Sequence, residues 1–136
     1  MPRHALFSVG LSRGTGDCAI TCLAAITGAD YATVVAAVAR KYQRWRSGQG
    51  LTVPKIRAVA LELGCRLRWR RAGRFNLHQT AGIIVVRPHV AILKPRGKVH
   101  ETDGTLSKHD VTQWLARHAP TGDYGALIPG EDYTSP

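Results

Sequence analysis

Apolar residues recur at helical spacing through the first half of the chain. Over residues 17–27 they cover more than one side of the segment, which predicts a central, largely buried helix. Asp30 is an expected N-cap for a second helix over residues 31–44, where valines and alanines form an apolar stripe. A third helix is predicted over residues 53–63, with Pro54 in its first turn. The first half is therefore predicted to form a helical lobe.

The second half changes to the spacing of β-strands. Residues 65–70 alternate strictly, so Leu67 and Trp69 share one face of a half-buried strand and arginines occupy the other. Residues 95–97 predict a hairpin turn, and residues 110–118 a last helix. Apolar runs predict further strands at residues 82–87, 89–94 and 98–102, and an edge strand at residues 126–128.

This order of elements predicts an α+β fold in which an N-terminal helical lobe packs on a C-terminal antiparallel sheet. The 136 residues most simply form a single domain, 1–136, with a poorly ordered tail at 130–136. No apolar run is long enough to cross a membrane, and the first residues do not form a secretory leader. We therefore expect a cytoplasmic protein, or a virion-associated one if it is encoded by a phage.

Basic residues outnumber acidic ones by 19 to 9, which gives a formal net charge of +10. Such an excess favours an acidic partner or nucleic acid. One predicted strand carries a basic patch that consists of Arg66, Arg68, Arg70 and Arg71. Alternation places Trp69 on the opposite face, where it cannot stack bases beside these arginines. A solvated strand face is therefore the simpler interpretation, and nucleic-acid binding the alternative.

The three cysteines stand at irregular spacing. Their odd number argues against a disulfide scaffold, and Cys18 with Cys22 lacks the second ligand pair of a structural zinc site. We therefore predict neither a metal nor another cofactor. Cys22 and Cys65 are interpreted as small buried hydrophobic side chains.

Cys18 differs from the other cysteines because it follows a glycine-rich turn, residues 13–16, and opens the first helix. A helix N-terminus carries partial positive charge and unpaired backbone N–H groups, which bias a thiol toward thiolate. The same N–H groups, together with those of Gly16 and Asp17, could receive a developing oxyanion. Asp17 could alternatively serve only as an N-cap.

His89 opens an apolar strand and is the candidate base for a Cys18 nucleophile. Across the predicted hairpin lie two carboxylates, Glu101 and Asp103, either of which could orient the imidazole. They share one face of an alternating strand, so periodicity does not choose between them. His100 could replace the carboxylate. The other histidines are interpreted as solvated, and they are His4, His78, His109 and His118.

The order of these motifs resembles the papain-like cysteine peptidase superfamily, and most closely its small bacterial and phage members akin to the bacteriocin-processing C39-type domains. In those domains an Asp-Cys pair precedes an apolar helix that ends in Thr-Gly, as in residues 17–28 here. A histidine later opens a strand, and a strand ending in aspartate follows a glycine turn, as in residues 89–103 here. The resemblance covers residues 14–104 and implies a papain-like fold.

The resemblance further implies a peptidase or amidase that cleaves an amide or isopeptide bond through a thioester on Cys18. His89 is then the base, Glu101 or Asp103 orients it, and no cofactor is needed. The implied partner is a protein or peptide substrate, a cell-wall peptide among the candidates. The chain departs from the family at Ser12, where C39-type domains carry an oxyanion-hole glutamine.

Two alternatives stay open. One is a catalytically inactive papain-like binding module that uses the basic face for nucleic acid or an acidic protein, and the missing glutamine supports it. The other is an NlpC/P60-type cell-wall peptidase. Its His-Val-Gly-Ile motif resembles residues 89–92, but its Asp-Cys-Ser-Gly motif is not matched at residues 17–20.

Overall fold

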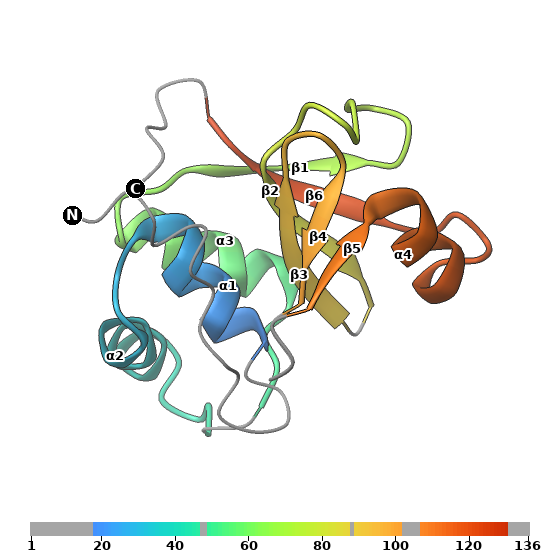
Figure 1. The fold of residues 1–136 in the computed structure, drawn as a ribbon. Helices are drawn as coiled ribbons and strands as arrows, with labels where there is room; N and C mark the ends of the chain where they lie inside the picture. The colour runs from blue at the N-terminus through green and yellow to red at the C-terminus, as the bar shows by residue number, and fades with distance from the viewer. Residues whose placement is uncertain (1–17, 47–48, 88, 102–106, 131–136) are drawn as a thin grey trace.

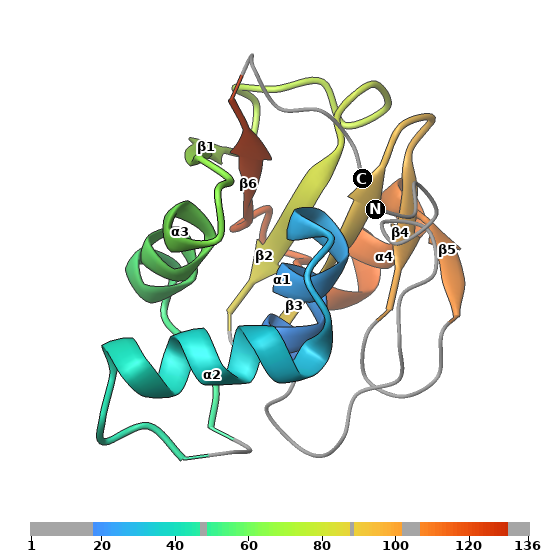
Figure 2. The ribbon, with the colours of Figure 1, turned by 90° about the vertical axis from the view of Figure 1, so that its left-hand side faces the viewer.

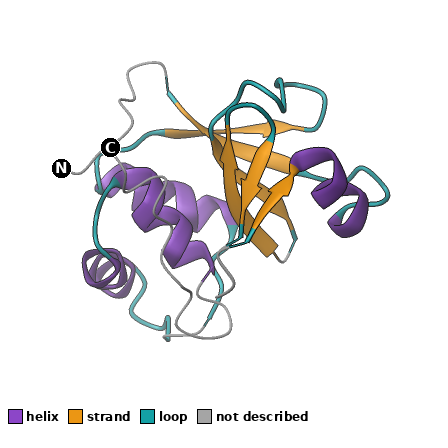
Figure 3. Ribbon diagram, viewed as in Figure 1, coloured by secondary structure: helices purple, strands orange, loops and turns teal. Residues whose placement is uncertain are grey.

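The structure is a computed structural model that describes residues 18–46, 49–87, 89–101 and 107–130. Its helices are α1 (Cys18–Thr27), α2 (Tyr31–Lys41), α3 (Val53–Glu62) and α4 (Val111–His118). Its strands are β1 (Leu67–Arg71), β2 (Gly82–Val86), β3 (His89–Lys94), β4 (Lys98–His100), β5 (Lys108–Asp110) and β6 (Gly125–Pro129). Three helices precede the strands along the chain, and the predicted α+β class is confirmed (Figures 1 and 3).

The strands of the described residues form one sheet in the order β1-β6-β2-β3-β4-β5. Every neighbouring pair is antiparallel. Because β6 lies between β1 and β2, the prediction of an edge strand at residues 126–128 is wrong. Ala126 and Leu127 are fully buried, one on each face of the sheet. A short apolar run does not reveal from the sequence which strands will flank it.

Helices cover both faces of this sheet. The helices α1, α2 and α3 lie on one side and α4 on the other (Figures 1 and 2). Successive residues of β2 therefore enter different core clusters: Ile83 packs with α1, and Ile84 packs with α4. Cover on both sides explains why β2 is buried at every position. The helix α1 is also buried along most of its length, as predicted.

Residues at the ends of the helices determine where several of them begin and stop. Asp30 caps α2 by accepting a hydrogen bond from the backbone N–H of Thr33 at 2.7 Å, as predicted. Asp110 caps α4 in the same way. The helix α2 ends at Lys41, before the predicted residue 44, because Tyr42 takes a non-helical conformation. The strand β5 was not predicted, since its sequence Lys-His-Asp has no apolar pattern.

The hairpin between β3 and β4 turns at residues 95–97, as predicted, with positive φ at Arg96 and Gly97. Most of the predicted tail lies outside the described residues, although the N–H of Gly130 still donates to the carbonyl of Arg66 at 2.9 Å. Within the described ranges, no single helix has the length and apolar character to cross a membrane. The helices α1 and α2 have that length and apolar character only when they are counted together, and the chain bends by 112° at the break between them.

Candidate active site

Cys18 is the first residue of α1, and α1 packs against β3. This packing brings the half-buried thiol to the imidazole of His89, the first residue of β3, and the two share a hydrogen bond. The backbone of Val90 makes a further hydrogen bond to the sulfur. The sequence reasoning did not identify this backbone contact, because it depends on how the helix sits on the strand.

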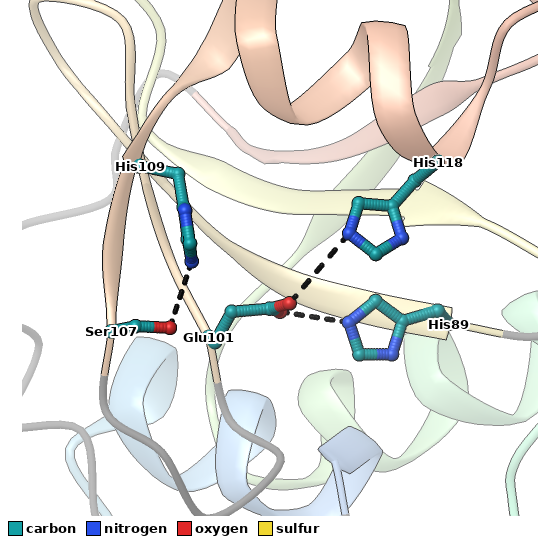
Figure 4. A network of polar contacts seen from close by, with 5 residues as sticks. All are labelled: His89, Glu101, Ser107, His109 and His118. Carbon is teal, nitrogen blue, oxygen red and sulfur yellow. Dashed lines mark hydrogen bonds and ion pairs between the residues drawn. The ribbon is translucent and has the colours of Figure 1, made fainter.

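His89 is held from its other side by Glu101. Its Nε2 lies 2.8 Å from Oε1 of the carboxylate (Figure 4). Since Nε2 is engaged there, Nδ1 is the ring nitrogen left for the Cys18 thiol. The three side chains thus form a chain from sulfur through imidazole to carboxylate.

Glu101 follows β4 directly, and its backbone N–H donates to the carbonyl of Ser107 at 2.9 Å. The residue is only 5% exposed. Burial of a carboxylate is costly unless it is paired, so the contact with His89 accounts for its position. Of the two open choices for the orienting group, Glu101 occupies the place beside His89. Asp103 lies outside the described residues, as do Gly16 and Asp17 of the expected oxyanion turn.

The Cys18–His89 hydrogen bond is the largest influence on the ionisation of both groups. It lowers the pKa of the Cys18 thiol, while burial acts in the opposite direction. It raises the pKa of His89 to about 9, again against burial, and the hydrogen bond that His89 donates to Glu101 adds to the rise. Both shifts favour a thiolate–imidazolium pair near neutral pH.

Two residues of α4 complete the surroundings of His89. The ring of His118 stacks on it with centroids 5.5 Å apart, and Trp114 lies 5.9 Å from it. The interpretation of His118 as a solvated side chain is wrong, since it is two-thirds buried beside Glu101. Its spacing of four residues from the buried Trp114 was the available signal, because residues four apart share a helix face.

The remaining candidates lie elsewhere. His100 pairs with Ile92 across the β3–β4 ladder and so faces the α1 side of the sheet, where burial lowers its pKa to about 4. His109 is bonded to Ser107 and not to the carboxylate (Figure 4). Cys22 and Cys65 are buried, as predicted. In the part of the chain that the structure describes, no group of three or more potential metal ligands gathers.

The predicted basic patch lies on β1 and the residue before it. All four arginines are exposed, while Leu67 is buried and Trp69 is partly buried. Alternation predicted this for Arg66, Arg68 and Arg70, whereas Arg71 is exposed although it falls on the Leu67 side. The patch belongs to an edge strand of the sheet. It is a solvated face that is separate from the Cys18 site in the fold.

Comparison with known proteins yields no match, whether to protein-family models, to curated proteins or to solved structures.

Proposed function

We propose that the protein is a cysteine hydrolase that cleaves an amide or isopeptide bond, with Cys18 as nucleophile, His89 as acid and base, and Glu101 as the orienting carboxylate. The observation that carries the proposal is the continuous hydrogen-bonded chain from the Cys18 thiol through His89 to Glu101. A structural cysteine needs neither a histidine partner nor a carboxylate behind that histidine. The papain-like resemblance supports the same assignment.

In the first half of the reaction, the Cys18 thiolate attacks the carbonyl carbon and forms a tetrahedral oxyanion. The C–N bond then breaks while the His89 imidazolium gives its proton to the departing amine, which leaves a thioester on Cys18. In the second half, His89 takes a proton from water as the water attacks the thioester. The C–S bond breaks, the carboxylic acid leaves, and the thiolate and imidazolium are restored.

Glu101 supports both halves through His89. Its hydrogen bond to Nε2 fixes which ring nitrogen faces the sulfur, and its charge favours the imidazolium. The backbone N–H groups in the first turn of α1 are the donors that we assign to the oxyanion, because the first turn of a helix has no acceptors for them within the helix itself.

A test of the proposal follows the alkylation of each cysteine by iodoacetamide between pH 5 and 9, with peptide mass spectrometry as the readout. Cys18 is expected to react faster than Cys22 and Cys65 already at pH 6, because the thiolate is the reactive form, the pKa of the Cys18 thiol is lowered, and Cys18 is partly exposed whereas the other two are buried. The variant His89→Ala is expected to remove this advantage, and His78→Ala serves as the matched control. Equal reactivity of the three cysteines at pH 6, or an unchanged Cys18 in His89→Ala, would overturn the proposal.

Turnover is tested with p-nitrophenyl esters and with a peptide library that includes isopeptides and peptidoglycan stem peptides. Hydrolysis that disappears in Cys18→Ala is the expected result. The stem-peptide arm distinguishes an NlpC/P60-type substrate from a protein substrate.

The exposed arginines of β1 favour one second candidate, a binding module for nucleic acid or an acidic protein. Salt-dependent binding of a DNA duplex that survives Cys18→Ala and is lost on replacing Arg68 and Arg70 would support it. Binding that is unaffected by those arginines would remove it.

A further inference from the structure

The carboxylate of Glu101 lies near two histidines from different elements, His89 of β3 and His118 of α4. Its Oε1 is 2.8 Å from Nε2 of His89, and its Oε2 is 3.9 Å from Nε2 of His118 (Figure 4). The two imidazole rings are stacked at 5.5 Å with 22° between their planes. One buried anion therefore faces two groups that can each carry a positive charge.

The helix α4 determines the position of His118. Trp114, one helical turn earlier, is 2% exposed and lies 4.5 Å from the His118 ring. Asp110 caps the start of the same helix, and Val111 is fully buried. The His118 ring thus contacts both Trp114 and His89, and these contacts keep it beside Glu101.

We propose that His118 is a positioning residue that competes with His89 for Glu101 when it is protonated, and that it thereby sets the acid limit of the site. The proposal rests on the proposed function for its catalytic consequence, but the competition itself does not depend on catalysis. At 3.9 Å, a neutral His118 leaves the carboxylate to His89, whereas a protonated one gains an ion pair with Oε2.

The charged groups around His118 agree with this assignment. Burial lowers the pKa of His118 and Glu101 opposes that effect, while the neighbouring His89, Arg117 and His109 lower it further. His118 therefore takes up its proton at a lower pH than an ordinary histidine does. Once His118 is protonated, two stacked cations share one carboxylate, and His89 is no longer the sole cationic partner of Glu101.

The test is an NMR titration of the imidazole C–H signals between pH 4 and 10 in the full-length protein. His89 stays protonated below pH 7, because its pKa is about 9. Its signals are nevertheless expected to shift a second time below pH 6.5, at the midpoint of the His118 titration. This second inflection should vanish in both His118→Gln and Glu101→Gln, and persist in the control His109→Gln.

A flat His89 signal below pH 7 would overturn the proposal, and so would a second inflection that survives in His118→Gln. The catalytic consequence is read from the pH profile of ester hydrolysis, in which His118→Gln moves the acid limb to lower pH. A purely structural role would instead lower the rate at every pH. Absence of any hydrolysis would sink the proposed function, whereas the NMR result decides the competition separately.

Discussion

Oε1 of Glu101 lies 2.8 Å from Nε2 of His89, across the β3–β4 hairpin and 12 residues further along the chain. The carboxylate is 7% exposed, so water does little to screen the contact. A strong hydrogen bond between a buried carboxylate and an imidazolium is thus part of the site before any substrate arrives.

The variant Glu101→Gln keeps the size of this side chain and removes its charge. We expect the pKa of His89 to fall by on the order of one unit, because a neighbouring opposite charge is lost. Iodoacetamide labelling of Cys18 at pH 6 should slow in parallel. An NMR titration of His89 measures the first effect, and a His89 pKa that stays near 9 in the variant would contradict it.

The variant Cys18→Ala tests the other side of the imidazole. The hydrogen bond to Cys18 is the largest cause of the raised His89 pKa, so its removal should bring that pKa down toward the ordinary value near 6.5. Cys22→Ala is the matched control, since that buried thiol lies one turn further along α1. A larger fall in Cys22→Ala than in Cys18→Ala would show that the assigned partner is wrong.

His100 predicts how the stability of the fold depends on pH. Its pKa is about 4 in the folded protein, chiefly through burial and secondarily through Lys94 and Lys108, against about 6.5 when unfolded. A lowered folded-state pKa contributes stability that is present above pH 6.5 and is lost as the pH falls toward 4. The free energy of unfolding should therefore decline in this window by up to ~1.4 kcal/mol per pH unit from this group.

Urea unfolding of the wild type and of His100→Gln at pH 4.5, 5.5 and 7 measures this contribution. The decline should be shallower in His100→Gln, while the exposed His78→Gln should follow the wild type. Parallel profiles for the wild type and His100→Gln would refute the assignment.

Gly82 in β2 is a position in the sheet where a larger side chain does not fit. A Cβ at this position would collide with the backbone carbonyl of Leu127 in β6, and backbone atoms cannot move aside as a side chain can. We expect Gly82→Ala to destabilise the protein by about 1–3 kcal/mol. Thermal unfolding should show a clear drop in Tm, whereas Gly50→Ala, whose Cβ meets nothing within 4 Å, should leave Tm near the wild-type value.

The helices, strands and turn that carry the site could be predicted from the sequence, because the residue patterns that indicate them lie within each element. The helix at Cys18, the strand at His89 and the turn at residues 95–97 each follow from patterns within a dozen residues. It could not choose Glu101 over Asp103, since both obey the same alternation. In the structure β4 stops at His100, so the alternation on which that comparison relied ends before Glu101.

Long-range relationships were the ones that sequence patterns missed. The last helix was predicted, with Trp114 inward, but nothing local shows that α4 crosses to the side of Glu101 and brings His118 with it. The central place of β6 was missed for the same reason. The order of strands in a sheet depends on how the apolar faces of distant segments pack together. A sequence pattern shows that a segment has an apolar face but not which other segment it packs against.

The position of β6 also has a consequence for how the molecule is assembled. In the described sheet β1 pairs only with β6, although more than fifty residues separate them along the chain. All elements that meet at Cys18, His89 and Glu101 are synthesised earlier, yet β1 has no partner strand until residues 125–129 emerge. Such distant pairing makes folding slow and leaves an open strand edge for as long as synthesis continues. A nascent chain can thus carry every residue of the proposed site while β1 still awaits the strand that joins it to the rest of the sheet.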